Sequence, residues 1–562
     1  GLDGLTIEIT DGSFVGTVTA GSVTSGAIAV VADEQLAILN RVHSNGEAGT
    51  NDFIVSTVRD LIPGTGIATS TISQGVGGAI DILSPGKLIV MNEIEPPSDP
   101  SLQPSFGGIA TVSLGGDGGA LRVTADSIVI DGSEEGPFVP DFDDITADSL
   151  RNIPTGFSSA TRGFGNTGAL TVNARSLELR EGAGITSGAV LGSLGNGAPL
   201  TFNITDIIDL NGKVILGNSS VDDNTIGNSG NLIINGGESA TIRVRNGAVI
   251  STSTNSQGEA GNLDITGANL EILSGGRVVA STVNSPKPSG NISINISDAI
   301  TIDGNLAQPE GAQPLSSGIF ASSEAGATGE AGNISISAEL IRMLAGGQIS
   351  TASEQTAGGN ILIEANGVQL LEDADITTNV VSGESGGGNI VFEGNTVVAL
   401  DDSDVLAFST GGPGGNVTFN SLFFGENYQP APPGTDLSTL NGNNRVDVNA
   451  SGTVDGIIVI QDVSFIEDSL NRLAAELVPP RDETFGSCIA RSSEETGISL
   501  TVTGADGLAS RPGDSVSQFP AVEVQPIERS GSDAFGEPED SFVEPTDIYR
   551  FSDGRIVMSR DC

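Results

Sequence analysis

The sequence predicts an all-β protein, a parallel β-helix in which short strands stack coil upon coil. Gly-Asn pairs recur through the middle of the 562-residue chain, and an alternating apolar run follows each pair. Successive pairs are 31, 29, 42, 27, 29 and 27 residues apart. Repeats of this length indicate stacked units, each of which buries its apolar face only against its neighbours. The seven pairs are Gly230-Asn231, Gly261-Asn262, Gly290-Asn291, Gly332-Asn333, Gly359-Asn360, Gly388-Asn389 and Gly415-Asn416.

Within one repeat, apolar and polar residues alternate in three short runs that Gly-rich corners separate. In the repeat after Gly261 the runs begin at Leu263, Leu270 and Val278. A period of two is typical of strands with one buried face, whereas apolar residues at helical spacing are missing. We therefore expect three strands per coil. Because parallel crossover connections are almost always right-handed, we expect a right-handed β-helix.

Stacking of such coils would place the Asn of each pair directly above the next, about 4.8 Å away. Asn side chains stacked in this way form a ladder of amide hydrogen bonds along the axis. The ladder candidates are Asn231, Asn262, Asn291, Asn333, Asn360, Asn389 and Asn416. The alternative is that these residues only fill turns, and the sequence leaves both interpretations open. Neither one makes them catalytic.

Composition favours a narrow stacked core. Aromatic residues make up 4% of the chain, Trp is absent, and 78 glycines supply corners that need a positive φ. The predicted organisation has four parts. Residues 1–228 form irregular coils with loop insertions, 229–424 the regular Gly-Asn coils, 425–480 an end cap, and 481–562 a C-terminal region with an acidic linker. Insertions at 95–104, 133–167 and 305–330 leave the solenoid at its corners, which often form the binding face.

The predicted end cap contains the one segment with a helical pattern, residues 464–477. Ser464 and Glu467 have the spacing of a capping box at its start. Four apolar residues then follow one face: Ile466, Leu470, Leu473 and Leu477. We expect this small helix to cover the open end of the coil stack, because an uncovered strand edge invites further pairing. An irregular tail follows.

The charge excludes some partners. Asp and Glu outnumber Lys and Arg by 71 to 23, which gives a net charge of −48. Such a chain repels nucleic acid, so we expect no DNA or RNA partner. No apolar run is long enough to cross a membrane as a helix. Because the sequence opens at Gly1 inside patterned residues, we expect a mature or truncated form.

The two cysteines, Cys488 and Cys562, both lie near the C-terminus and are candidates for one disulfide. Closing a loop of about 75 residues would stabilise the region by about 4 kcal/mol in the chain-entropy model. The alternative is two unpaired thiols.

Parallel β-helices also include enzymes that act on polysaccharides, and these use paired carboxylates. Asp373 and Asp375 are two residues apart, as are Asp402 and Asp404, so each pair could face one side of a strand. Exposed Asp-x-Asp pairs in so acidic a chain are more often a solvated face. The single histidine, His43, has no companion for a triad or a metal site. We expect no catalytic site, no metal and no cofactor.

Residues near the C-terminus carry a family resemblance. They are Asn443–Gly452 (NNRVDVNASG), Asp462–Leu470 (DVSFIEDSL), Ser487–Ser492 (SCIARS) and Glu544–Cys562 (EPTDIYRFSDGRIVMSRDC). With the Gly-Asn repeats, they resemble the filamentous-haemagglutinin-like exoproteins found largely in cyanobacteria. The resemblance spans residues 160–562.

This resemblance implies a surface or secreted β-helical protein exported by two-partner secretion through an outer-membrane barrel. The N-terminal secretion domain of that family is not found at the start of this sequence. In some relatives a C-terminal cysteine pair holds the protein on the cell surface, which the resemblance implies for Cys488 and Cys562. Members are described as adhesins, haemagglutinins or surface-layer proteins, although fold-level analogy does not identify a ligand.

The expected function is therefore that of a structural or adhesive β-helical protein, extracellular or on the outer cell surface. Head-to-tail or lateral self-association is expected, because a heterologous contact between rods propagates into a filament or surface layer. Surface glycans are further candidate partners. The alternative function is that of a polysaccharide-binding or polysaccharide-cleaving β-helix enzyme.

Overall fold

The computed structural model describes residues 2–10, 14–19, 26–40, 64–71, 74–92, 106–132, 155–190, 192–221, 225–308, 313–324, 326–381, 384–430, 439–440, 442–461, 547–550 and 556–559. The chain divides into two compact units, Gly1–Val463 and Ser464–Cys562. In the second unit, the described residues form one antiparallel pair, β33 (Asp547–Arg550) with β34 (Ile556–Ser559).

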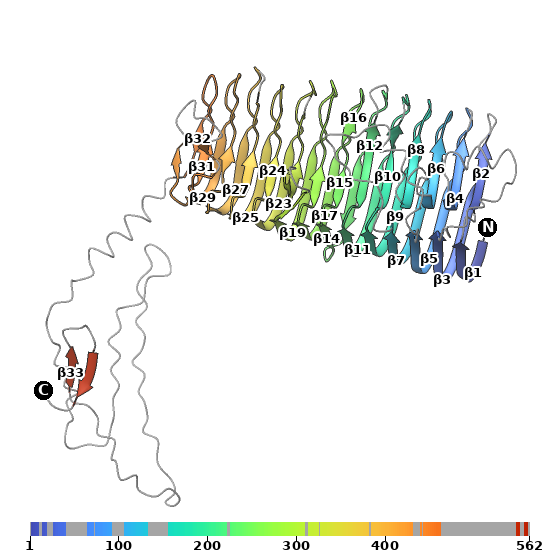
Figure 1. Cartoon of the computed structure of the whole chain (residues 1–562), viewed down its shortest axis with the longest axis horizontal. Helices are drawn as coiled ribbons and strands as arrows, with labels where there is room; N and C mark the ends of the chain where they lie inside the picture. The colour runs from blue at the N-terminus through green and yellow to red at the C-terminus, as the bar shows by residue number, and fades with distance from the viewer. Residues whose placement is uncertain are drawn as a thin grey trace, which may run out of the picture. The chain divides into compact units, whose positions relative to one another are not determined.

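The first unit is a solenoid of two long parallel sheets, each with 15 strands, that alternate along the chain (Figure 1). The prediction of an all-β parallel β-helix is confirmed. The first sheet, sheet A, consists of β1 (Leu2–Thr10), β3 (Ile28–Asn40), β5 (Ile80–Asn92), β7 (Leu121–Asp131), β9 (Leu170–Arg180), β11 (Leu200–Asn211), β13 (Leu232–Gly236), β14 (Thr241–Arg245), β17 (Leu263–Leu273), β19 (Ile292–Asp303), β23 (Ile334–Leu344), β25 (Ile361–Leu370), β27 (Ile390–Ala399), β29 (Val417–Gly425) and β32 (Ile458–Val459).

The second sheet, sheet B, contains shorter strands that follow those of sheet A after a corner. It consists of β2 (Phe14–Thr19), β4 (Gly64–Thr71), β6 (Phe106–Ser113), β8 (Thr155–Thr161), β10 (Ala183–Val190), β12 (Ile215–Val221), β15 (Val249–Ser251), β16 (Thr254–Asn255), β18 (Arg277–Val279), β22 (Gly318–Phe320), β24 (Gln348–Ser350), β26 (Asp375–Thr377), β28 (Val405–Leu406), β31 (Asp447–Asn449) and β30 (Gln429–Pro430). Most sheet B strands are followed by a loop that returns the chain to sheet A, and these return loops project together along one edge (Figure 1).

The expectation of three strands per coil is corrected to two. In β17 the first two predicted runs belong to one strand, because the alternation of buried residues shifts by one position where the register changes between Gly267 and Asn269. The strand therefore bends without losing its backbone pairing. Among the described coils, a single one separates the runs, as β13 and β14. The third side of the later coils is a column of single bridges through Thr254, Thr282, Ser323, Ser353, Val380 and Ser409.

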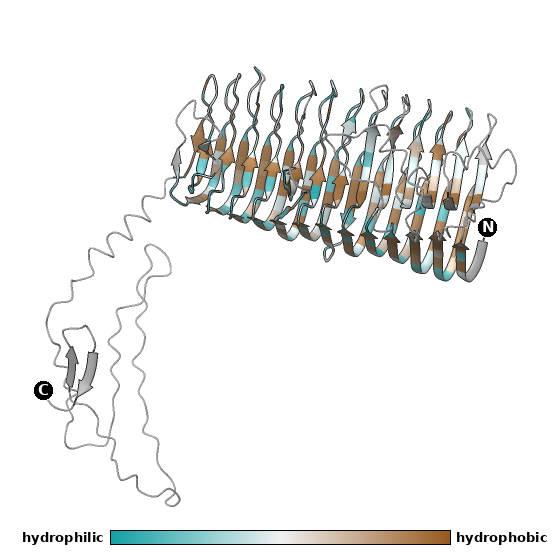
Figure 2. Ribbon diagram, in the orientation of Figure 1, coloured by the Kyte–Doolittle hydropathy of each residue, from teal (hydrophilic) through white to brown (hydrophobic). Residues whose placement is uncertain are grey.

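The core lies between the two sheets and is built from columns of like residues. The first buried position of the sheet A strands pairs in register from coil to coil and is always aliphatic: Leu121, Leu170, Leu200, Leu232, Leu263, Ile292, Ile334, Ile361, Ile390 and Val417. All ten are at most 1% exposed. Apolar residues accordingly follow the strands, whereas the return loops are mostly polar or neutral (Figure 2).

In the return loops the backbones of neighbouring coils touch. A Cβ added to Gly359 would lie 1.8 Å from the carbonyl oxygen of Gly332 in the preceding coil. Only glycine permits this approach. Hydroxyl groups directly after sheet B strands satisfy the loop carbonyls, as in the 2.7 Å bonds from Thr351 Oγ1 to Gly359 O and from Thr378 Oγ1 to Gly388 O. This narrow side of each coil is therefore held by hydrogen bonds rather than by apolar packing.

The boundary expected at residue 228 is not a break in the stack, because β11 pairs directly with β13 and β14. The prediction of an insertion over residues 133–167 is wrong for its second part, because residues 155–161 form β8 of sheet B. The insertion at 305–330 begins as an antiparallel hairpin of β20 (Asn305–Leu306) and β21 (Leu315–Ser316). The Asn305 amide donates to the Ala345 carbonyl at 3.2 Å, which fixes the hairpin to the next corner. The insertion at 95–104 lies outside the described residues.

The last coils of the first unit contain an aromatic cluster. The Phe392 and Phe419 rings stack with centroids 4.8 Å apart, and Phe423 follows at 4.3 Å from Phe419. Tyr428 meets Phe423 edge-on at 5.5 Å. The predicted helix at 464–477, with its cap residues Ser464 and Glu467, lies outside the described residues, and no α-helix occurs among those described.

Candidate binding surface

The seven asparagines proposed from the Gly-Asn repeat form a continuous ladder, which we call the strand-entry ladder. Each of them directly precedes a sheet A strand. From Asn262 onward, each backbone N–H donates to the Oδ1 atom of the ladder Asn one coil earlier at 2.9 Å. Ile457 continues the column by donating to Asn416 at 2.8 Å. From Asn333 onward, each side-chain amide also donates to the preceding Oδ1 at 3.0 Å. These residues therefore join the coils along the axis.

The strand-entry ladder supplies a hydrogen-bond acceptor for the backbone N–H at the start of each strand. The Leu232 N–H donates to the Asn262 carbonyl at 2.9 Å, so the ladder residue already gives its carbonyl to the coil before it. Its own N–H points to the same coil, where the Asn231 side chain supplies the acceptor. The Asn carboxamide oxygen thus takes the place of a backbone carbonyl as acceptor for this N–H. Without it the N–H would be unpaired, which is costly for a backbone donor.

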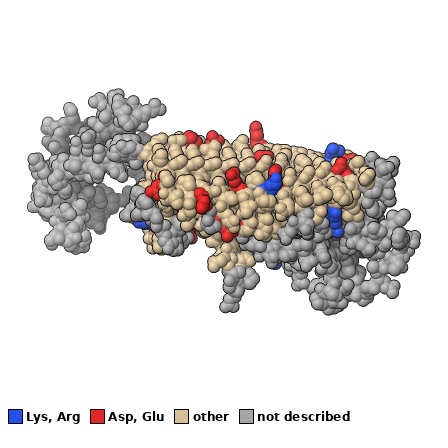
Figure 3. Space-filling view, turned by 90° about the horizontal axis from the view of Figure 1, so that it is seen from above, with Lys and Arg blue, Asp and Glu red and all other residues tan. Residues whose placement is uncertain are grey.

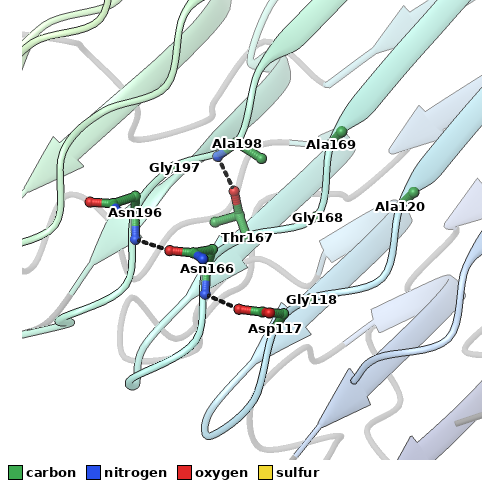
Figure 4. A pocket seen from close by; sticks show the side chains of 10 residues that line it. All are labelled: Asp117, Gly118, Ala120, Asn166, Thr167, Gly168, Ala169, Asn196, Gly197 and Ala198. Carbon is green, nitrogen blue, oxygen red and sulfur yellow. Dashed lines mark hydrogen bonds between the residues drawn. The ribbon is translucent and has the colours of Figure 1, made fainter. Parts of the chain in front are cut away.

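A second column, the return-loop ladder, runs through the earlier coils four residues before the strands instead of one. Its members are Asp117, Asn166, Asn196, Asn228 and Glu259. From Asn166 onward, each backbone N–H donates at 2.9 Å to the side chain of the member before, and Figure 4 shows the first two of these bonds. The coil with both Asn228 and Asn231 belongs to the two columns. The next coil, with Glu259 and Asn262, is joined to it through both columns, so the two ladders overlap between these coils.

Sequence reasoning missed the return-loop ladder, although its signal is present. Asn166, Asn196 and Asn228 each follow a glycine, and the three are 30 and 32 residues apart. These Gly-Asn pairs differ from the others only in their distance from the next apolar run.

A shallow groove of about 490 Å³ lies beside the return-loop ladder (Figure 4). The ladder side chains Asp117, Asn166 and Asn196 form one border. The floor consists of small residues, Gly118, Ala120, Gly168, Ala169, Gly197 and Ala198, together with Thr167. Thr167 Oγ1 accepts the Ala198 N–H at 2.5 Å, so its hydroxyl holds the two coils together. The groove runs across successive coils.

The four aspartates considered as a catalytic set are divided between two places. Asp373 and Asp402 lie at the corners between sheets with φ of 66° and 65°, where other coils place Gly275 or Gly346. Asp375 begins β26 of sheet B and Asp404 directly precedes β28, and the two form a short column with Asp447 of β31. Asp375 Oδ1 accepts the Asp404 N–H at 3.0 Å, and Asp404 Oδ1 accepts the Asp447 N–H at 2.8 Å.

The environment of Asp375 and Asp404 favours protonated carboxyl groups. Burial, with a smaller contribution from neighbouring carboxylates, raises the pKa of Asp375 to about 7 and that of Asp404 to about 8. The Arg445 guanidinium forms an ion pair with Asp447 at 2.9 Å, at the end of the column. The column therefore resembles the asparagine ladders in its bonding and differs from them in its response to pH.

Other charged side chains are dispersed over the first unit. On the face seen in Figure 3, acidic and basic residues are scattered and form no continuous patch among the described residues. Several pair across coils on the outer face of sheet A. Arg175, for example, contacts Asp126 at 3.1 Å and Asp206 at 2.7 Å. Exposed pairs of this kind add little stability.

Some predicted residues cannot be placed. Cys488, Cys562 and His43 lie outside the described residues, so their pairing and contacts stay predictions. Within the part of the chain that the structure describes, no three His, Cys, Asp or Glu side chains are grouped as metal ligands would be. The same residues include no helix of the length and apolarity that a membrane span requires.

No protein-family model matches the chain, and no curated protein matches it. The argument for function therefore depends on the residues and their geometry.

Proposed function

We propose that this protein is a secreted or cell-surface rod with a structural or adhesive role. The observation that carries the proposal is the unbroken stack of the first unit. Sheet A passes in order through 14 strands from β1 to β32, all paired in parallel. At about 4.8 Å per coil, this stack is roughly 60 Å long. Two side-chain ladders reinforce it, which suits a part that spans distance and resists bending.

The surface chemistry supports an extracellular setting. The chain has a net charge of −48, which keeps rods soluble and apart. The resemblance to filamentous-haemagglutinin-like exoproteins supports export by two-partner secretion, with an outer-membrane barrel as the export partner. Head-to-tail or lateral self-association would then build a filament or a surface layer.

Labelling of intact producing cells tests the proposal. An antibody raised against residues 229–424 should bind the outside of unpermeabilised cells or detect the protein in the medium. Cells that lack the protein should attach less well to surfaces or to each other. Signal found only after the cells are opened would contradict the extracellular role. Electron micrographs of released material then separate continuous fibres, which indicate a filament subunit, from discrete rods.

One observation favours a second candidate function, that of a polysaccharide-cleaving enzyme. Asp375 and Asp404 are neighbouring carboxyl groups with pKa values of about 7 and 8, a property common at catalytic sites. Against it, one oxygen of each group accepts a backbone N–H of the next coil. Loss of polysaccharide cleavage in a folded Asp404→Asn variant would establish the enzyme and displace the structural role.

A further inference from the structure

A row of exposed apolar side chains runs along the return loops of three successive coils. Phe164 is 76% exposed, Leu194 47% and Ile226 58%. Their loops are stacked in register, since the Leu194 N–H donates to the Gly163 carbonyl at 2.9 Å and the Ile226 N–H to the Ser193 carbonyl at 3.0 Å. Large apolar side chains exposed in a continuous row are unusual on a soluble surface and indicate a contact site.

This apolar row runs parallel to the return-loop ladder. Each apolar residue lies two positions before a ladder asparagine, and the residue between them is a buried glycine, as in Phe164, Gly165 and Asn166. The side chains of the two rows therefore share the outer face of the loops. Beyond the ladder lies the groove with its floor of Gly and Ala residues. Together the three features form a track along the axis of the solenoid.

The amide groups of the return-loop ladder are free donors. Asn166, Asn196 and Asn228 each use Oδ1 to accept a backbone N–H from the next coil. Within the described coils, their Nδ2 groups donate to no protein acceptor, whereas Asn333 and Asn360 of the strand-entry ladder donate theirs to the preceding Oδ1. The track thus offers a series of unpaired amide donors, one for each coil.

Charge narrows the choice of ligand. The ladder begins at Asp117 and ends at Glu259, so a carboxylate stands at each end of the three amides, and Glu259 also pairs with Lys287 at 3.8 Å. An anionic polymer would be repelled at the Asp117 end, and a cationic group could not accept from an amide. The ligand must present neutral oxygen acceptors beside apolar surface, repeated at the spacing of the coils.

We propose that this track binds a neutral linear polysaccharide laid along the axis, and the inference rests on the adhesive role proposed above. Sugar rings combine apolar C–H faces, which would cover Phe164, Leu194 and Ile226, with hydroxyl oxygens, which would accept from the amides. A hydroxyl accepts and donates through a group that rotates to suit its partner. An extended peptide fits less well, because its backbone N–H groups are donors of fixed direction that would face a row of amide donors.

Two variants test the track without disturbing the stack. The first is the triple change Phe164→Ser, Leu194→Ser and Ile226→Ser, which alters only exposed side chains. The second is Asn196→Asp, which keeps the oxygen that accepts the Asn228 N–H and removes the amide donor. Matched controls elsewhere on the surface are Phe424→Ser, at a side chain 60% exposed, and Asn295→Asp, at an exposed asparagine.

Binding would be measured by calorimetry with cellohexaose, maltohexaose and N-acetylchitohexaose, and with hexagalacturonate as the anionic comparison. We expect at least one neutral hexasaccharide to bind, with affinity at least tenfold weaker in both track variants and unchanged in both controls. Hexagalacturonate should bind at least tenfold more weakly than that neutral sugar. Circular dichroism and sedimentation velocity on each variant establish that the fold and the oligomeric state are unchanged.

Three results would overturn the inference: no binding of any neutral sugar, equal losses in the controls, or a change of oligomeric state in the triple variant that reveals a contact between copies. Surface labelling of cells that produce the triple variant separates this inference from the proposed function. A variant still displayed and still adhesive would refute the sugar track alone. A wild-type protein found only inside cells would refute the adhesive role, whatever it binds in solution.

Discussion

The Oδ1 atom of Asn333 accepts both the backbone N–H of Asn360 at 2.9 Å and its side-chain amide at 3.0 Å. One carboxamide therefore receives two donors from the coil that follows. The same pair of bonds recurs at Asn389 and Asn416, so the strand-entry ladder is a repeated two-donor contact and not a series of isolated turns.

Removal of one rung should weaken the stack measurably. Asn360→Ala eliminates the bond from its own amide to Asn333 and both bonds that its oxygen receives from Asn389. Because the site is exposed and water replaces part of the loss, we expect a decrease of about 1–2 kcal/mol in the free energy of unfolding. Urea unfolding followed by circular dichroism measures it. Asn295→Ala, an exposed asparagine outside the ladders, is the control, and equal effects of the two would refute the ladder's contribution.

Glycine at the loop contacts should tolerate no side chain. In Gly359→Ala the new Cβ would overlap the Gly332 carbonyl of the preceding coil, and neither backbone can retreat without breaking the stack. We expect destabilisation of about 3 kcal/mol or more, at the upper end for overpacked sites. At Gly26 an added Cβ meets nothing within 4 Å, so Gly26→Ala should change the melting temperature little. Similar melting temperatures for both variants would contradict this account.

The aspartate column should make the last coils less stable as the pH rises. The folded-state pKa values of Asp375 and Asp404, about 7 and 8, lie above the value of about 3.9 for an unfolded chain. A raised pKa in an acidic group means that the folded state binds protons more tightly. The contribution of these two carboxyl groups to the stability of the folded state is therefore complete below about pH 4. It is lost as the pH rises through about 7 to 8.

Asp404→Asn should remove much of this pH dependence, because an amide keeps the oxygen that accepts the Asp447 N–H and carries no proton to lose. Limited proteolysis between pH 5 and 9 measures the exposure of the last coils. Wild-type protein should be cut faster at pH 9, and the variant should be cut at a nearly constant rate. Asp298→Asn, at an exposed site on β19, is the control, and an identical pH profile for wild type and Asp404→Asn would exclude the column as the cause.

The buried rings of the aromatic cluster should contribute most to the free energy of unfolding. Phe419 is fully buried and stacked on Phe392, whereas Phe424 on the same strand is 60% exposed. We expect Phe419→Ala to cost about 3–5 kcal/mol of unfolding free energy, as for other buried aromatic residues. Phe424→Ala should change it by no more than about 0.5 kcal/mol. Equal losses in chemical unfolding would mean that the outer ring is covered in solution.

The fold of the regular Gly-Asn coils could be predicted well from the sequence, because the alternation of apolar and polar residues in each repeat shows which side chains are buried. Leu263 and Ile265 alternate with polar residues and are buried as expected. The number of strands per coil was wrong, since alternation alone does not show whether a one-residue slip at Gly267 ends a strand or only bends it. Backbone pairing with the next coil decides that point, and a single repeat does not contain it.

Residues of the candidate surface were harder to predict. Gly165-Asn166 and Gly332-Asn333 have the same two residues, but they differ in their distance from the following strand. This distance determines whether the Asn joins neighbouring coils in the return loop or at the start of the strand. Exposure of Phe164 was equally hidden, since an apolar residue in a loop is more often buried than displayed. The aspartates were placed on one strand face by their spacing, whereas the positive φ of Asp373 and Asp402 assigns those two residues to corners.

The coil that holds both Asn228 and Asn231 acts as an adaptor between two sets of modules. From Asp117 up to this coil, neighbouring coils connect through the return loop. The next coil connects to it both there and at the strand entry, and the later coils connect at the strand entry. A coil copied within one ladder would keep its acceptor aligned with the donor of its neighbour, whereas a coil exchanged between the two sides of residues 228–231 would lose a ladder bond.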